Sequence, residues 1–252
     1  MRIFLLFLFL LTDLRATTPP WGASRHALLV EHAQELEKDL KQYPSFPFPV
    51  SAEEVFKLFP KQRIPIFAYG SLLYPESALK TIPQTTVDTY RLVVAYGFQR
   101  AFNYKASLSK KLARKSDVAM LNVFQAKFSD IVNGILMWVT HDDLTKLVQR
   151  EKGYYLKPVI VSDWEQGLNC TISQPNFWLA YVFIAPSESS YSHPKINPYP
   201  PYANAALLGA KRYGEMFFTF WLETTFLADL ITPFSSWIEN PQIDCSRKKL
   251  CK

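Results

Sequence analysis

Glycine and histidine are scarce in this chain, and several catalytic patterns that depend on them are missing. There are 8 Gly and 4 His among 252 residues. The histidines, His26, His32, His141 and His193, are dispersed without paired spacing, and there is no CxxC motif. Such clusters are what hold zinc and related metals, so we expect no metal site. No phosphate-binding loop and no dinucleotide fingerprint is present either.

Long hydrophobic runs are also missing, apart from one near the N-terminus. Residues Ile3 to Leu11 are apolar without interruption and follow Arg2. This run is too short to span a bilayer comfortably, but it suits the hydrophobic region of a secretory signal. We therefore predict a signal peptide over residues 1–16 and a secreted or periplasmic protein, with an uncleaved anchor as the alternative. No second run indicates an integral membrane domain.

Cysteine is rare as well, with Cys170, Cys245 and Cys251 the full set. In an exported chain, three cysteines leave one unpaired. Cys245 and Cys251 would close a short terminal loop, or Cys170 would pair with either of them. Asn169 begins a glycosylation pattern, which has meaning only in a eukaryotic host.

Positive charge exceeds negative charge only modestly, at +6. The basic residues form two clusters, Lys110 with Lys111, Arg114 and Lys115, and Arg247 with Lys248, Lys249 and Lys252. Neither cluster is interleaved with aromatic side chains that would stack on bases. We interpret both as solvated and expect no nucleic-acid partner.

Aromatic residues, by contrast, are plentiful at 15% of the chain, which favours a packed, β-containing core. Runs of branched and aromatic residues predict strands over 64–69, 87–96, 118–127, 131–140, 154–164 and 176–184. Together these strands are enough to close a small barrel. Phe128-Ser129-Asp130 predicts a tight hairpin between two of them.

Helices are expected on both sides of this strand region. Ser24 is expected to cap a helix that runs to about Gln42, and Ser51 with Glu54 forms a capping-box pattern for another. The prolines of 43–49 predict an extended linker between the two. Further helices are predicted over 141–148, from Tyr202 to a stop at Gly214, and from there to about Leu230.

One stretch, Ile64 to Pro75, has the pattern of a ligand-binding turn. Strand residues lead directly into Gly70-Ser71, and Pro75 marks a helix start. A glycine turn after a strand exposes backbone N–H groups, which can hold a carboxylate or a developing oxyanion. An ordinary strand-to-helix turn is the alternative. Ser71 lacks the second glycine of a nucleophile elbow, so serine hydrolysis is not expected.

This turn is the first of four motifs that follow one another along the chain. They are Tyr69-Gly70-Ser71-Leu72, Gly97-Phe98-Gln99-Arg100-Ala101-Phe102-Asn103, Asn133-Gly134, and Arg150-Glu151 with Gly153-Tyr154. With these motifs, the chain from about Pro65 to Asp229 resembles the gamma-glutamylcyclotransferase-like family. The glutathione-specific ChaC branch and bacterial relatives pair a YGSL turn with a later RE…GY signature.

The resemblance implies an α+β fold, a small mixed β-barrel flanked by helices. It places the family domain at residues 62–232. A helical extension with a proline-rich linker would precede it over 17–61, and a basic tail would follow over 233–252.

The resemblance also implies an activity, the release of 5-oxoproline from a γ-glutamyl compound. The substrate's own α-amine attacks its γ-carbonyl, so the enzyme's task is to fold the substrate and move protons. Glu151 is the expected general acid and base. The structural alternative is that Glu151 only pairs with Arg150 or Lys152 at a helix end.

Other positions have implied roles in binding. The expected substrate-binding residues are Tyr69, Gly70, Ser71, Leu72, Tyr154 and Tyr202. A hydrogen bond within the core is the alternative for Tyr202. Arg100 and Asn103 match family positions too, and we interpret them as scaffold, with binding of a substrate carboxylate as the alternative.

The expected partner is a small-molecule γ-glutamyl substrate, with no cofactor, and the protein is expected to be a monomer or a weak dimer. The segment from Arg150 to Gly153 is shorter than its ChaC counterpart. A γ-glutamylamine or another γ-glutamyl metabolite is therefore an alternative to glutathione. A non-catalytic exported binding module on the same fold is an alternative of a different class.

Overall fold

A computed structural model describes residues 20–59, 63–105, 118–164, 176–185 and 196–239. The elements, in chain order, are α1 (Ala23–Leu40), α2 (Ala52–Lys57), β1 (Ile64–Ala68), the 3-10 turn η1 (Ser71–Leu73), α3 (Pro75–Ala78), α4 (Gln84–Val87), β2 (Arg91–Tyr96), β3 (Phe98–Lys105), β4 (Val118–Gln125), β5 (Ile131–Val139), α5 (His141–Arg150), β6 (Tyr155–Asp163), β7 (Phe177–Ile184), β8 (Asn197–Pro198), α7 (Pro200–Lys211), α8 (Glu215–Glu223), β9 (Thr225–Phe226) and α9 (Phe234–Glu239). The predicted signal peptide, all three cysteines, Asn169 and both basic clusters lie outside the described residues.

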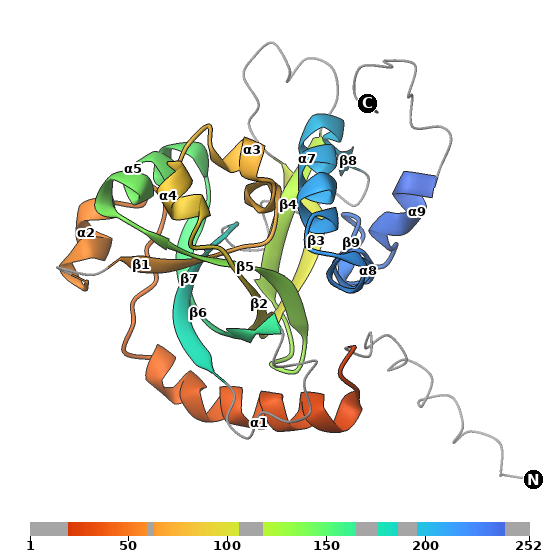
Figure 1. Ribbon diagram of the computed structural model, residues 1–252, viewed down its shortest axis with the longest axis horizontal. Helices are drawn as coiled ribbons and strands as arrows, with labels where there is room; N and C mark the ends of the chain where they lie inside the picture. The colour runs from red at the N-terminus through yellow and green to blue at the C-terminus, as the bar shows by residue number, and fades with distance from the viewer. Residues whose placement is uncertain (1–19, 60–62, 106–117, 165–175, 186–195, 240–252) are drawn as a thin grey trace, which may run out of the picture.

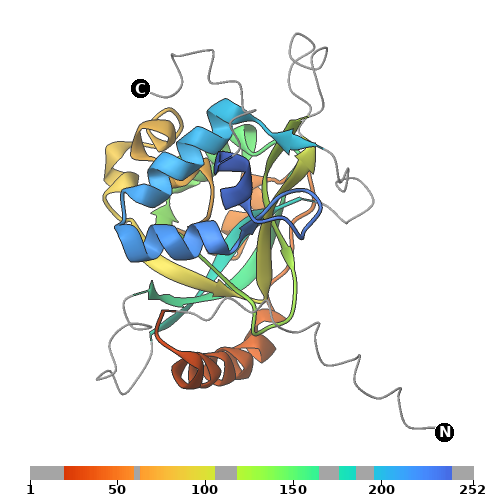
Figure 2. The same cartoon turned by 90° about the vertical axis from the view of Figure 1, so that its right-hand side faces the viewer.

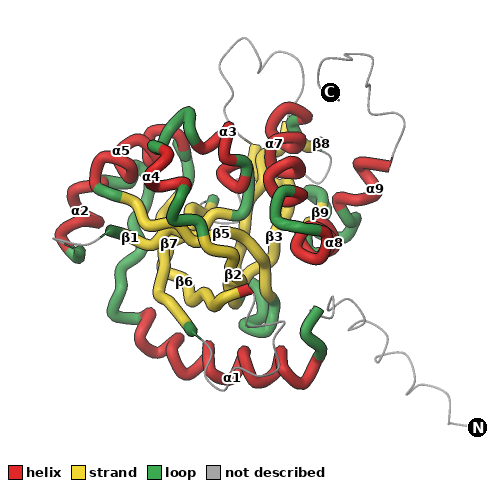
Figure 3. The backbone as a smooth tube through the Cα atoms, viewed as in Figure 1, coloured by secondary structure: helices red, strands yellow, loops and turns green. Residues whose placement is uncertain are grey.

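Five strands form a closed barrel in the order β1-β5-β2-β6-β7. Most neighbours are antiparallel, and the parallel pairing of β1 with β7 closes the ring. The β5 strand is paired on both sides, and eight of its nine residues are buried, in keeping with a sequence that is apolar apart from Asn133. Figure 3 shows the strands at the centre with helices around them. The predicted α+β fold with a small mixed barrel is confirmed.

A second sheet of four strands, in the order β8-β4-β3-β9, stands beside the barrel. Its β3 strand falls in the Gly97–Asn103 motif and was not among the predicted strands. The hairpin predicted at 128–130 is wrong, because β4 pairs with β3 and β8 whereas β5 pairs only within the barrel. The connection carries the chain from one sheet to the other. Apolar patterning identifies a strand but does not select its partner.

The N-terminal segments pack against the barrel. Figure 1 shows α1 lying across one end of it, where the helix contacts β6. The predicted Ser24 cap is wrong, because α1 already begins at Ala23 after Gly22, whose φ of 84° suits glycine. The Ser51 cap of α2 is confirmed, since its Oγ accepts a hydrogen bond from the Glu54 N–H at 3.3 Å. In the linker, Phe46 exchanges main-chain hydrogen bonds of 2.8 and 2.9 Å with Leu156 of β6.

The last helices lie beside the second sheet (Figure 2), where α7 contacts β4 and α8 contacts β9. The α8 helix ends at Glu223, short of the predicted end near Leu230, because Thr225 enters the short strand β9. Beyond it, the ring of Phe234 is buried 4.5 Å from that of Phe102. The helix α9 begins at Phe234, so helical structure reaches into the segment predicted to be the basic tail.

Candidate active site

The turn after β1 is built around a close approach to α7. Leu73 N–H donates to Gly70 O at 2.9 Å, which starts η1. A Cβ on Gly70 would lie only 2.6 Å from the Tyr202 hydroxyl. Glycine is therefore needed at position 70 for space.

The α7 helix packs directly on the same turn through a second glycine. A Cβ on Gly209 would lie 2.5 Å from Tyr74 N and 2.6 Å from the Leu73 carbonyl carbon. The Tyr213 hydroxyl, just past α7, donates to Leu73 O at 3.0 Å. The turn is thus held from one side by a helix backbone.

The α5 helix ends on the other side of the turn. Thr140 begins it with a capping box shared with Asp143, and Glu151 is its C-cap residue. Gly153, with φ of 90°, then redirects the chain toward β6. A Cβ there would also collide with the Tyr104 hydroxyl, so glycine is required on both counts. This ending fixes the position of the Glu151 side chain.

A cavity brings most of the predicted site residues together. Its lining consists of Phe67, Ala68, Tyr69, Gly70, Ser71, Leu72, Leu121, Glu151, Phe183 and Tyr202. These residues come from strands, the turn, α5 and α7, which the fold assembles at one place. Tyr154 does not line the cavity. Its buried hydroxyl donates to Leu121 O at 3.0 Å, behind the cavity wall.

Arg150 connects the turn to the carboxylate. Its Nη1 donates to Ser77 O at 2.7 Å and Thr81 Oγ1 at 3.0 Å, and its Nη2 donates to Ser77 Oγ at 2.9 Å and Ser71 Oγ at 3.0 Å. The Arg150 Nε lies 3.4 Å from Glu151 Oε1. The ion pair that was the structural alternative for Glu151 therefore exists, and the same carboxylate also faces the cavity.

The cavity perturbs the ionisation of Glu151. Burial raises the pKa of its carboxyl group, and the Arg150 charge opposes this rise. The side chain keeps 21% of its surface exposed, which leaves a route for proton exchange. A carboxyl group in this state can both accept and donate a proton nearer neutral pH.

Four tyrosines surround this carboxylate. Burial raises the pKa of Tyr69, Tyr104, Tyr154 and Tyr202, and the Glu151 charge raises each one further. All four hydroxyls therefore stay protonated and act as donors. The Tyr69 hydroxyl is already committed to Phe183 O at 2.8 Å. Hydrogen bonds between the Tyr202 hydroxyl and the main chain and hydroxyl of Ser71 offset part of the rise in the pKa of Tyr202.

Arg100 lies in the core and does not line the cavity. Its side chain is fully buried and donates to Thr225 Oγ1, Thr224 Oγ1, Trp221 O and both oxygens of Asn133, at 2.7 to 3.1 Å. Burial lowers the pKa of this guanidinium. Its described partners are all neutral, and they favour the scaffold interpretation.

Asn103 is also buried and accepts a hydrogen bond from Asn122 Nδ2 at 3.2 Å. Asn122 Oδ1 in turn accepts from Ala185 N–H at 2.9 Å. This chain ties β3 and β4 to the end of β7, which again favours a scaffold role.

Sequence reasoning missed how Arg150 serves the site. The RE motif placed it beside Glu151, but nothing in the sequence indicated a bond to Ser71, 79 residues away. Leu121 and Phe183 were missed as well, because apolar strand residues carry no signal of which cavity they face.

The described ranges contain neither a metal-binding cluster nor a membrane-spanning helix. No group of three or more His, Cys, Asp or Glu side chains there is arranged to hold a metal ion. None of the helices in these ranges combines the length and apolar composition needed to cross a membrane.

Comparison with known proteins finds similarity only among solved structures. No protein-family model and no curated protein matches the chain. A gamma-glutamyl cyclotransferase is 19% identical over 60% of this chain and 80% of its own, with a TM-score of 0.44. An uncharacterized protein from Homo sapiens is also 19% identical, covering 61% and 82%, with a TM-score of 0.45. A yeast gamma-glutamyl cyclotransferase specific to glutathione is 13% identical, covering 64% and 97%, with a TM-score of 0.37. The structural neighbours thus include gamma-glutamyl cyclotransferase-like folds at low sequence identity.

Proposed function

We propose that the protein is a γ-glutamyl cyclotransferase that cleaves a γ-glutamyl amide or peptide and releases 5-oxoproline. The observation that carries this proposal is that Glu151, whose pKa is raised by burial, lines one cavity with the Tyr69–Leu72 turn. The reaction needs one carboxyl group and a set of fixed donors close together. The motif resemblance points to the same activity.

In this proposal the γ-glutamyl group binds at the turn, with its γ-carbonyl oxygen toward backbone N–H groups near Ser71. Negative charge develops on this oxygen when the carbonyl is attacked, and fixed donors stabilise it. This cavity has a volume of about 30 Å³. In this proposal the half-buried Tyr202 side chain, which lies over Gly70, moves aside when the γ-glutamyl group binds.

The proton transfers are assigned to Glu151. The carboxylate takes a proton from the substrate's α-ammonium group, and the free amine attacks the γ-carbonyl carbon. A new C–N bond closes the lactam ring and the original C–N bond breaks. The proton on Glu151 then passes to the departing nitrogen, and the second proton that the attacking nitrogen loses also goes to the released amine, so that the products are 5-oxoproline and an ammonium ion. No water is consumed, and the carboxylate is regenerated.

The test is 5-oxoproline release by purified protein from glutathione, a γ-glutamyl amino acid and a γ-glutamylamine. Glu151→Gln keeps the shape and removes the titrating group, and we expect it to lower release by about 10²- to 10⁴-fold. Glu37→Gln, at an exposed position of α1, is the matched control and should behave like the parent. A folded parent that releases nothing from any substrate would contradict the proposal and favour the binding module.

Export is a separate proposal that rests on the Ile3–Leu11 run alone. N-terminal sequencing of the protein recovered outside the producing cell tests it. A mature chain that begins near residue 17 is the expected result, and a protein retained in the cytoplasm with its first residues intact would contradict it.

A further inference from the structure

A second and larger cavity adjoins the site on the far side of Ser71 and Tyr202, which line both cavities. Its volume is about 340 Å³, within the range of small-molecule sites. Arg150 lines it as well and contacts Glu151, which lines the first cavity. A substrate whose scissile bond lies at Ser71 would thus have one half in each cavity.

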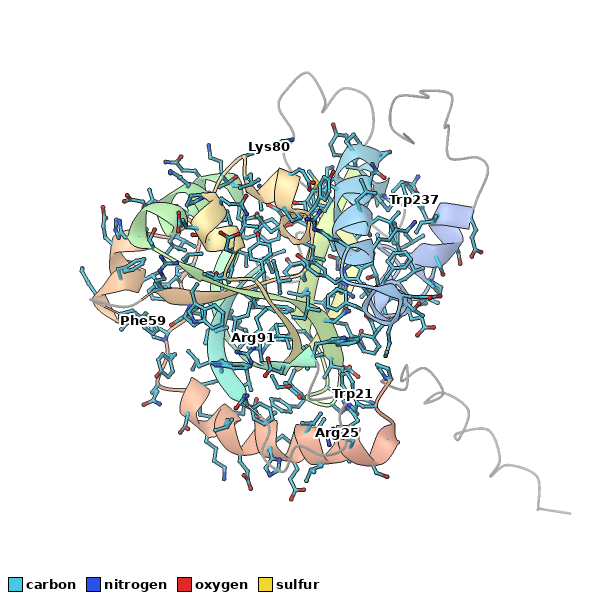
Figure 4. All side chains as sticks on the ribbon, in the orientation of Figure 1. Trp21, Arg25, Phe59, Lys80, Arg91 and Trp237 are labelled. Carbon is cyan, nitrogen blue, oxygen red and sulfur yellow. The ribbon has the colours of Figure 1, made fainter. Side chains whose placement is uncertain are left out.

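The charges around the second cavity leave one cation unbalanced among the described residues. Glu76 lies 3.8 Å from Arg212 in an ion pair, and Arg150 is occupied by Glu151 and by hydroxyl and carbonyl oxygens. Lys80 lines the same cavity, is exposed, and has no ion pair with a described residue. Figure 4 places Lys80 at the edge of the molecule near α3. Within the described part of the chain its ammonium group has no acidic partner, and it can therefore bind an anion.

The remaining walls suit a side chain with apolar character. Tyr74 and Tyr199 supply rings with polar tips, and Met120 supplies an adaptable apolar surface. An occupant with an apolar or aromatic body and a carboxylate at one end would match both these walls and Lys80. An amino acid or a short peptide has this chemistry, whereas a simple amine lacks the carboxylate.

We propose that the second cavity binds the leaving half of the substrate and that Lys80 binds its carboxylate. The inference rests on the proposed cyclotransferase function and names the substrate class as γ-glutamyl amino acids or peptides. Lys80 is a specificity-determining residue that takes no part in the proton transfers.

The experiment compares γ-glutamylphenylalanine with its C-terminal carboxamide, which has the same size and lacks the charge. The parent should have a kcat/KM about fivefold higher for the acid, as expected for a solvent-accessible charge pair. Raising the salt concentration should reduce this preference. Lys80→Met should bring the ratio close to one, and Lys80→Arg should preserve it. Lys41→Met removes an exposed charge at the end of α1 and should keep the parental ratio.

The outcomes separate the inference from the function on which it rests. Cleavage of both substrates with equal kcat/KM, or a preference that survives in a folded Lys80→Met variant, would overturn the role of Lys80 and leave the cyclotransferase intact. A preference for γ-glutamylphenethylamine over γ-glutamylphenylalanine would do the same. Failure of the folded parent to cleave any γ-glutamyl compound would overturn the function and the inference together.

Discussion

Glu151 is subject to opposite requirements from folding and from chemistry. Burial raises the pKa of its carboxyl group in the folded protein, so the folded state binds its proton more tightly than the unfolded state does. The stabilising contribution of this group is therefore complete below its unfolded pKa, about 4.3, and is lost as the pH rises through the folded pKa. An ionised Glu151 carboxylate at neutral pH therefore lowers the free energy of unfolding.

Glu151→Gln should consequently stabilise the protein at neutral and alkaline pH. We expect its free energy of unfolding to exceed that of the parent at about pH 8, with the difference shrinking toward about pH 4. Urea denaturation at a series of pH values measures this. A variant less stable than the parent at about pH 8 would show that Glu151 serves mainly as the ion-pair partner of Arg150.

Arg150→Lys tests whether the guanidinium positions the site. Lysine keeps the charge, but its single nitrogen cannot reproduce four hydrogen bonds to Ser71, Ser77 and Thr81. We expect the free energy of unfolding to fall by about 1–3 kcal/mol and kcat/KM to fall about tenfold or more. Arg63→Lys, at an exposed position with one long bond to Trp138 O, is the control. Unchanged kcat/KM in a folded Arg150→Lys variant would argue against positioning.

Sequence motifs identified several of the individual residues that the fold brings together. One cavity is lined by Glu151, the Tyr69–Leu72 turn and Tyr202, although Tyr69 and Tyr202 are 133 positions apart in the sequence. The anchoring role of Arg150 could not be predicted, because it depends on where the Ser77 and Thr81 oxygens lie. Tyr154 was predicted to contact substrate, but it does not line this cavity, and its hydroxyl donates to Leu121 O.

Among the elements, α7 has the closest contact with the site. Gly209→Ala would bring a Cβ to 2.6 Å from the Leu73 carbonyl carbon, and neither backbone can move freely. We expect a loss of about 1–3 kcal/mol in the free energy of unfolding and a higher KM, as the helix is pushed away from the turn. Thermal unfolding and steady-state kinetics measure the two effects.

The control for this variant is Leu208→Ala, on the same helix with 40% of its surface exposed. It should change the free energy of unfolding by less than about 1 kcal/mol. Equal effects of the two substitutions would show that contact between α7 and the turn is not what matters.

Strand positions were predictable, but strand partners were not. Branched and aromatic runs identified all five barrel strands, because burial on a pleated surface selects these residues. The segment 118–127 has the same composition yet belongs to the other sheet. The β3 strand was missed because Gln99, Arg100 and Asn103 interrupt its apolar pattern, and in the structure Arg100 and Asn103 satisfy their polar groups inside the core.

For the molecule as a whole, Arg100 joins the two sheets. From β3 it reaches Asn133 of the barrel, Trp221 of α8 and Thr225 of β9. Arg100→Lys should lower the free energy of unfolding by about 3 kcal/mol or more, because buried acceptors lose their donors. The folded fraction should keep the parental KM. A raised KM with unchanged stability would instead support the reading that Arg100 binds a substrate carboxylate.

The most direct test of the central claim is to run the reaction in water labelled with a heavy oxygen isotope. Mass spectrometry then shows whether the glutamyl product carries an oxygen atom from the solvent. Intramolecular attack by the α-amine predicts 5-oxoproline that carries no solvent oxygen, formed by the parent and nearly lost in Glu151→Gln. Free glutamate that carries one solvent oxygen would mean hydrolysis by water, and it would contradict the proposed cyclotransferase.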